Sequence, residues 1–124
     1  MLGNDATNYY NSGYAKAATQ DWNDAILDYT VAIEREPGYV DAYMGRGEAK
    51  SDKIDLDGAI ADWSKVVELK PDSASGYERR GLVKKAKGDL DDSNADFKKA
   101  IELNPKLQTF IQTQGYPATQ NNSN

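Results

Sequence analysis

Residues 23–35 carry apolar and small side chains at the spacing of one helix face. The positions that form this pattern are Ala25, Ile26, Tyr29, Ala32 and Ile33. Their order i, i+1, i+4, i+7, i+8 places them on one side of a helix with 3.6 residues per turn. A second helical stretch precedes them, from about Tyr9 to Ala18. We therefore predict two helices joined by a short turn.

The whole pattern recurs with a period of 34 residues and without insertions. The positions that superpose include Tyr9, Tyr43 and Tyr77; Gly13, Gly47 and Gly81; Lys16, Lys50 and Lys84; Asp21, Asp55 and Asp89; and Pro37, Pro71 and Pro105. A fixed period of this length indicates a repeat protein in which each unit is one supersecondary element. The units span residues 6–39, 40–73 and 74–107, and each is expected to hold two helices, the second of which ends at the proline.

Small residues mark the places where helices are expected to cross. Gly13 and Ala25, with their equivalents in the other units, lie where the two helices of a unit approach most closely. A larger side chain there is expected to cost about 1–3 kcal/mol in overpacking. Ala32, Val66 and Ala100 are expected to have the same role against the next unit.

A short helix is predicted after the third unit. Leu107, Phe110 and Ile111 follow the spacing i, i+3, i+4, and Gly115 stands where a helix would end. We expect a capping helix over residues 105–115, overlapping the end of the third unit and covering its apolar face. Residues 1–5 form an N-terminal flank, and the polar residues 116–124 are expected to be a disordered tail.

The segment Asp55-Leu56-Asp57-Gly58 is similar to part of a calcium-binding loop. An EF-hand loop needs oxygen ligands at positions 1, 3, 5 and 12 around a Gly at position 6. With Gly58 at position 6, position 1 is Lys53 and position 12 is Ser64, so the pattern fails at both ends. An aspartate recurs at this point of every unit, between the two helices, where Asp is a favoured N-cap. We predict no metal site and no cofactor.

Composition narrows the possible functions. The chain has no Cys and no His, which removes disulfides, thiolate metal sites and the commonest general base. Fifteen Lys and Arg against 20 Asp and Glu give a net charge of −5, so a nucleic-acid partner is not expected. No apolar run approaches the roughly 20 residues of a membrane span. The start of the chain lacks the features of a signal peptide, so we expect a cytoplasmic protein.

These residues resemble the tetratricopeptide repeat. Its 34-residue unit carries an aromatic residue at position 4, Gly at 8, Ala at 20, an aromatic residue at 24, Ala at 27 and Pro at 32, and the match covers residues 6–107. The resemblance implies an all-α fold, a right-handed superhelix of three stacked helix-turn-helix hairpins. It also implies a concave groove lined by the first helix of each unit, in which family members bind a peptide, and a protein that is not an enzyme.

The sequence departs from the family pattern at three kinds of position. Position 7 is usually Leu but is Ser12, Arg46 or Arg80 here, and position 11 holds lysines. Their stems are expected to cover apolar surface while the charges reach water. Position 15 is usually Gly, but Ile54 would be strained in a left-handed turn, so we expect a different turn in the second unit. Ser93-Asn94 replaces Ala-Ile in the third unit, whose second helix is expected to pack less well.

The resemblance places positions 2, 5, 9, 12 and 13 of each unit on the groove. The residues selected are Thr7, Tyr10, Tyr14, Ala17 and Ala18; Asp41, Met44, Glu48, Ser51 and Asp52; and Ser75, Glu78, Leu82, Lys85 and Ala86, with Arg79 nearby. The site that we predict within this set consists of Tyr10, Tyr14, Asp41, Met44, Glu48, Asp52, Glu78, Arg79, Leu82 and Lys85. Aromatic and Met side chains offer adaptable contact area, and four carboxylates make the lining acidic. We expect a protein or peptide partner with an apolar or aromatic anchor and basic flanks.

One family device is a carboxylate clamp for the acidic C-terminal tails of chaperones. The five clamp positions hold Tyr10, Tyr14, Gly45, Ser75 and Arg79. Only the arginine matches, and a carboxylate needs several convergent donors to offset its desolvation. Binding of chaperone tails is therefore not expected.

Three other interpretations of these residues and of the function are open. Tyr10 or Tyr14 could pack between helices, with the carboxylates forming an ordinary solvated face. The chain could dimerise or stack through its terminal helices, with Leu107, Phe110 and Ile111 covering a neighbouring copy. An enzyme is the third reading, but the pair Asp91-Asp92 lies at a turn without a partner base, where the two residues are expected to act as solvated helix caps.

Overall fold

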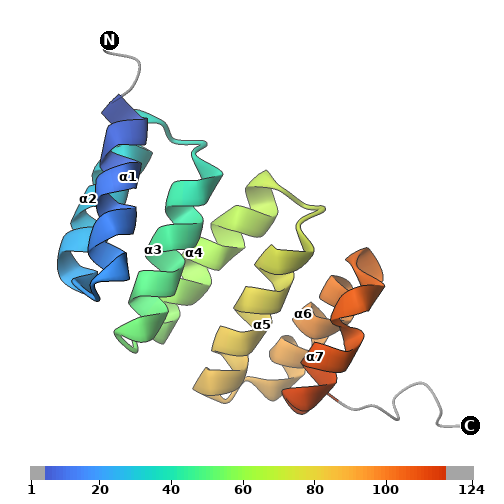
Figure 1. Ribbon diagram of the computed structural model, residues 1–124. Coiled ribbons are helices and arrows are strands. Elements are labelled where there is room, and N and C mark those ends of the chain that lie inside the picture. The colour runs from blue at the N-terminus through green and yellow to red at the C-terminus, as the bar shows by residue number, and fades with distance from the viewer. Residues whose placement is uncertain (1–4, 117–124) are drawn as a thin grey trace, which may run out of the picture.

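The computed structural model describes residues 5–116, and that part of the chain is all-α (Figure 1). Its elements are α1 (Asp5–Ala18), α2 (Trp22–Arg35), α3 (Val40–Asp52), α4 (Leu56–Leu69), α5 (Ala74–Lys87), α6 (Leu90–Leu103), the 3-10 helix η2 (Pro105–Leu107) and α7 (Gln108–Thr113). Each predicted unit holds two helices, and the predicted all-α solenoid is confirmed. The first helix begins at Asp5, about four residues earlier than the sequence pattern indicated, and α2 begins at Trp22, one residue earlier.

The hairpins stack in chain order. In Figure 1, α1, α3, α5 and α7 lie on the near side, α2, α4 and α6 lie behind them, and α1 and α7 lie at opposite ends of the stack. Within a hairpin α1 packs on α2, α3 on α4 and α5 on α6, while α2 packs on α3 and α4 on α5 between hairpins. The second helices α2 and α4 are therefore each held between two first helices, and the first helices are left to form one face.

The recurring glycine makes room for the recurring aromatic ring. A Cβ added to Gly13 would lie 2.9 Å from Cδ1 of Tyr29, and one on Gly47 would lie 2.9 Å from Nε1 of Trp63. The three rings, with Phe97 in the third unit, are at most 1% exposed. The 34-residue period thus repeats one contact, a ring of the second helix seated against a glycine of the first.

The apolar core is divided into three clusters, one for each hairpin. The first contains Ala25, Tyr29, Ala32 and Ala42; the second contains Ala59, Trp63, Val66 and Val83; the third contains Phe97, Ala100, Ile111 and Tyr116. The first two clusters each include a residue of the next hairpin. In the third cluster, Ile111 of α7 and Tyr116 take the place of the residue from a next hairpin, and Ile111 is fully buried.

The end of the chain differs from the expectation in two ways. Phe110, predicted to face the third unit, is 44% exposed. Tyr116, predicted to begin the disordered tail, is buried with its ring edge-on to Phe97 at 6.2 Å between centroids. Ile111 and Gly115 follow Tyr77 and Gly81 by 34 residues, so α7 occupies the place of a fourth first helix. The rest of the predicted tail, 117–124, and residues 1–4 of the flank lie outside the described residues.

The turn between the helices of a unit is the same in all three units. Gln20, Ile54 and Gly88 have φ angles of 64°, 65° and 98°. The residue after each one donates its N–H to a carbonyl five residues back, at Lys16, Lys50 and Lys84 respectively. The expectation of a different turn at Ile54 is therefore wrong. Packing of both helices and these backbone bonds outweigh a left-handed penalty of about 1–2 kcal/mol.

Relief of this strain is a testable consequence. Because the Ile54 side chain is 74% exposed, Ile54→Gly loses little packing and removes the left-handed penalty. The added flexibility of the unfolded chain offsets part of the gain. We expect the free energy of unfolding to rise by about 0.5–1 kcal/mol in urea denaturation. Gly88→Ile is the matched control and should lower it; equal effects of both changes would contradict the account.

Asp21, Asp55 and Asp89 are the N-cap residues of α2, α4 and α6, as predicted. Only the Asp55 carboxylate accepts a capping hydrogen bond, from the Gly58 N–H at 3.1 Å. The segment that is similar to a calcium loop thus begins a helix. Within residues 5–116 no three acidic side chains are placed to hold a metal ion.

In the second and third units the charges at positions 7 and 11 are mostly buried, whereas they were expected to reach water. Arg46 donates from Nε and Nη2 to both oxygens of Asp62, at 2.9 and 2.8 Å, and from Nη1 to Thr30 Oγ1 of the preceding unit. Lys50 Nζ lies 3.4 Å from the same carboxylate, which is 3% exposed. Arg80, Lys84 and Asp96 repeat this arrangement, with Ser64 as the acceptor in the preceding unit. Each arginine therefore pairs with a buried carboxylate of its own hairpin and joins that hairpin to the preceding one through a hydroxyl group.

The first unit has a smaller version of this arrangement. Ser12 Oγ donates to Asp28 at 2.6 Å, and Lys16 Nζ lies 2.9 Å from the same carboxylate. Burial alone would raise the pKa of Asp28, but these two partners outweigh it and lower the pKa. Position 23 thus holds a paired aspartate in all three units.

The third unit accommodates its serine without an unpaired polar atom. Ser93 is 1% exposed, and its hydroxyl donates to the carbonyl of Gly81 at 2.8 Å. The hydroxyl fits in the alanine position because a backbone acceptor lies opposite it. Ser93 therefore leaves no buried polar atom unpaired, and the poorer packing expected for this helix stays a prediction.

Candidate functional site

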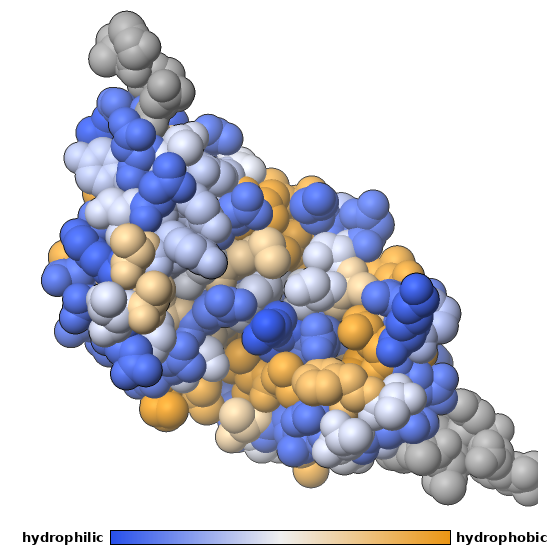
Figure 2. Space-filling view, in the orientation of Figure 1, coloured by the Kyte–Doolittle hydropathy of each residue, from blue (hydrophilic) through white to orange (hydrophobic). Residues whose placement is uncertain are grey.

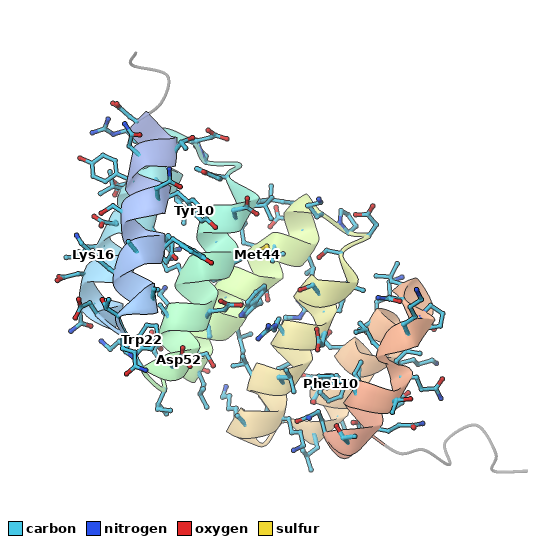
Figure 3. The ribbon with its side chains drawn as sticks, in the orientation of Figure 1. Tyr10, Lys16, Trp22, Met44, Asp52 and Phe110 are labelled. Atoms are coloured by element: carbon cyan, nitrogen blue, oxygen red, sulfur yellow. The ribbon has the colours of Figure 1, made fainter. Side chains whose placement is uncertain are left out.

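The near face carries two adjacent hollows. The first, of about 390 Å³, lies between α1 and α3. Its lining residues are Tyr10, Tyr14, Ala17, Ala18, Trp22, Tyr29, Asp41, Met44, Gly45, Glu48, Ala49 and Asp52. In Figure 3, Tyr10 extends from α1 toward α3, and Trp22 and Asp52 lie together at the other end of these helices. We call this the first hollow.

The second hollow, of about 310 Å³, lies between α3 and α5. Its lining residues are Glu48, Ser51, Asp52, Trp63, Arg79, Leu82, Val83 and Ala86. Glu48 and Asp52 line both hollows, and they stand one helical turn apart on α3. The two hollows are thus neighbouring parts of one groove, with these carboxylates on the ridge between them.

Most of the predicted groove residues come together at these hollows. Tyr10, Tyr14, Asp41 and Met44 line the first hollow, and Arg79 and Leu82 line the second. Glu78 and Lys85 line neither. The stem of Lys85 runs instead beside the capping segment, because a Cβ on Gly115 would lie 3.4 Å from its Cε.

Three aromatic rings of the hollows were not predicted. Trp22 and Tyr29 lie in the first hollow and Trp63 in the second. They belong to the second helices, whereas the groove positions were assigned to first helices only. Gly45 leaves room for one of them at the wall of the hollow: a Cβ there would lie 2.5 Å from Cζ of Tyr29. A glycine in mid-helix, opposite a large ring, was the signal available in the sequence.

Tyr10 stands at the centre of an aromatic group. Its ring centroid lies 5.3 Å from that of Tyr39, 5.7 Å from Tyr29 and 6.2 Å from Tyr14. Tyr10 thus packs between helices, as the alternative reading held, and also lines the first hollow. Tyr14 is different: its side chain is 64% exposed and contributes little to the packing of the fold.

The groove has a negative electrostatic character. Glu48 forms a long ion pair with Arg79, 3.8 Å between oxygen and nitrogen, and both side chains are about half exposed. Within residues 5–116 no ion pair involves Asp41 or Asp52. Burial, and next the charge of Asp41, raise the pKa of Tyr10. Burial is also the main cause that raises the pKa of Tyr29 to about 12.

The raised tyrosine pKa values predict a loss of stability in alkali. In the unfolded chain a tyrosine ionises near pH 10, whereas folded Tyr29 stays neutral to about pH 12. The unfolded state therefore releases protons first, and stability should fall as the pH rises from about 10 to about 12. Tyr29→Phe should flatten this fall in urea denaturation followed across the alkaline range. An unchanged slope would contradict the burial of this phenol.

The space-filling view shows how polarity is distributed on this face. Figure 2 shows apolar surface gathered along the middle of the face, over α3 to α5, with strongly hydrophilic side chains beside it. The aliphatic side chains and the methionine that line the hollows here are Met44, Ala49, Leu82, Val83 and Ala86. A ligand that covers this band would bury apolar surface and meet charge at its edges.

Comparisons with known proteins agree with the fold and the repeat pattern. A family model described as tetratricopeptide repeat matches residues 74–107. The Arabidopsis OM64 TPR domain superposes with a TM-score of 0.81 at 24% identity, over 86% of this chain and 88% of that one. The third unit therefore matches the tetratricopeptide repeat in sequence, and the described residues share the fold of TPR domains. No match was found among curated proteins.

Two further solved structures are similar. The first TPR of Spaghetti (RPAP3), bound to the HSP90 peptide SRMEEVD, has a TM-score of 0.80 and 21% identity, covering 91% of this chain and 95% of that one. A crystal structure of MamA has a TM-score of 0.80 and 30% identity over 86% of this chain. This chain covers 63% of the MamA chain, less than two thirds of its length. Within residues 5–116, no helix has both the length and the apolar character needed to span a bilayer.

Proposed function

We propose that this chain is a non-catalytic protein–protein interaction module that binds a peptide or partner segment in its concave groove. The observation that supports this most is the pair of adjoining hollows on one face, of about 390 and 310 Å³. They combine exposed aromatic and aliphatic side chains with a few charges, the composition typical of recognition sites. An apolar or aromatic anchor fits the first hollow, where Tyr14 and Met44 offer surface that the fold does not use.

The sign of the groove charge argues for a basic ligand. The HSP90 peptide bound by the RPAP3 domain, SRMEEVD, carries three acidic residues. In this chain three carboxylates, Asp41, Glu48 and Asp52, line the hollows, and among the described residues Arg79 is the one cation that does so. An acidic segment would be repelled here, whereas basic flanks would be attracted and their association accelerated.

The structure gives less support to assembly through the terminal helices. Of the three residues considered for this role, Ile111 is fully buried in the third cluster of its own chain and Leu107 packs against the same cluster. Phe110 is left as an exposed apolar residue on α7. A single ring is a small area compared with the roughly 800 Å² per partner of a stable interface.

A peptide-display selection tests the proposal. The purified chain is the bait, and a Tyr14→Ala/Glu48→Lys variant is the counter-selection. We expect enrichment of aromatic or apolar motifs with basic neighbours that the variant no longer retains. Glu34→Lys, which makes the same charge change at an exposed position of α2, is the matched control and should retain them.

Two outcomes would overturn the proposal. One is that no motif is enriched, and the other is that the enriched motifs bind the Tyr14→Ala/Glu48→Lys variant as well as the original chain. In either case sedimentation velocity over a range of concentrations becomes decisive. A sedimentation coefficient that rises with concentration would then favour self-assembly.

A further inference from the structure

The fold holds three of its own arginines in the same way. Each guanidinium lies over a tyrosine ring and pairs with a carboxylate. The three sets are Arg35 with Tyr9 and Asp5, Arg46 with Tyr43 and Asp62, and Arg80 with Tyr77 and Asp96. In each set the guanidinium carbon is 5.5 or 5.6 Å from the ring centroid, and the nitrogen–oxygen distance is 2.6 or 2.8 Å. Tyrosine and carboxylate together form a recurring arginine holder in this chain.

The first hollow presents the same two groups toward solvent. The rings of Tyr10 and Tyr14 line it together with the carboxylates of Glu48 and Asp52. Among the described residues, no cation of this chain lies over either of these rings. Arg79 approaches Glu48 from the second hollow, but at 3.8 Å the pair is longer than the arginine pairs within the fold. Glu48 is therefore available to a better-placed guanidinium.

We propose that the segment bound in the groove places an arginine, rather than a lysine, in the first hollow, against the Tyr14 ring and paired with Glu48. This inference rests on the proposed function and adds the chemical identity of its basic residue. A guanidinium is planar, stacks on aromatic rings and donates two parallel hydrogen bonds to a carboxylate. A lysine ammonium is a compact, strongly hydrated charge. It can pair with the carboxylate but cannot stack on the ring or donate two parallel hydrogen bonds.

The inference gives Arg79 an unexpected role. A groove arginine would ordinarily be counted among the residues that bind the ligand. Here it competes with the ligand for Glu48 and adds positive charge at the ridge between the hollows. Replacing it with alanine should therefore strengthen the binding of a basic segment, by about twofold to fivefold for the loss of one half-exposed ion pair.

The test uses three probe peptides that differ at one position. They are acetyl-Phe-Ser-Arg-Ser-Leu amide and its versions with Lys or Gln in place of Arg. Each is titrated into the full 124-residue chain while backbone amide signals are followed by NMR, which detects millimolar binding. We expect the Arg peptide to bind about fivefold to tenfold tighter than the Lys peptide, with the Gln peptide weakest.

Protein variants locate the preference. Glu48→Gln should remove most of the difference between the Arg and Lys peptides, because it keeps the shape of the side chain and removes its charge. Glu78→Gln removes a carboxylate that lines neither hollow and should leave the difference unchanged. Arg79→Ala should tighten binding of the Arg peptide. Because Glu48 and Arg79 are about half exposed, these variants are expected to fold, and the amide spectrum itself reports any loss of folding.

The outcomes separate this inference from the proposed function. Equal binding of the Arg and Lys peptides, with shifts on α1 and α3, would overturn the arginine preference and leave groove binding intact. The same holds if display-selected peptides bind the groove but carry no arginine. Shifts confined to other faces for all three peptides, together with a selection that fails, would overturn both.

Discussion

Replacing Asp62 with alanine should lower the free energy of unfolding by about 3–5 kcal/mol, the usual cost of removing one partner from a buried ion pair. The carboxylate is 3% exposed and is shared by Arg46 and Lys50, which would both be left facing a site with no counter-charge. The loss should extend beyond one hairpin, because Arg46 also donates to Thr30 of the preceding unit. Urea denaturation followed by circular dichroism measures it.

The exposed pair between Lys87 and Asp57 is the matched control. Its nitrogen–oxygen distance is 2.8 Å, the same as between Arg46 and Asp62, but its side chains are 43% and 78% exposed. Asp57→Ala should therefore have a far smaller effect than Asp62→Ala, since solvent screens an exposed pair. Similar losses for the two variants would contradict the claim that burial gives the repeated aspartate its importance.

Gly81→Val should destabilise the third hairpin by about 1–3 kcal/mol through overpacking. A Cβ at this position would lie 2.7 Å from Cε1 of Phe97 and 3.3 Å from Cβ of Asp96. The ring is fully buried, so it has no free space into which it can move. Thermal and urea unfolding of the variant measure the loss.

Two further variants test the origin of this effect. Gly38→Val makes the same change at a glycine with nothing within 4 Å and should have little effect. Adding Phe97→Leu to Gly81→Val should recover part of the loss, with a coupling energy of about 1 kcal/mol in a double-mutant cycle. Strictly additive losses would show that the glycine and the ring do not depend on each other.

The repeat and its helices could be predicted because every unit repeats the same local signals. Apolar spacing, the aspartate between the helices and the terminal proline all act within a few residues of where they stand. The turn at Ile54 was predicted wrongly because its backbone conformation depends on how two long helices pack, which a single residue's preference does not reveal. The exposed Phe110 and the buried Tyr116 similarly depend on how α7 meets the third hairpin.

The pairs formed by the repeated aspartate could have been predicted from the 34-residue period. Ser12 and Asp28, Arg46 and Asp62, and Arg80 and Asp96 are each separated by 16 residues. A hydrogen-bonding or basic residue and an aspartate that recur together at one spacing are candidates for a pair, since helices of one hairpin lie against each other. The rings of Trp22 and Trp63 in the hollows could not be placed from first-helix positions alone, because a second helix supplies them.

Chemical-shift mapping of a display-selected peptide on the amide signals of this chain tests the central claim most directly. Binding in the groove predicts that the largest shifts fall on α1, α3 and α5, around Tyr14, Met44, Glu48 and Leu82. Shifts that concentrate on α2, α4 and α6, or on α7 around Phe110, would contradict it.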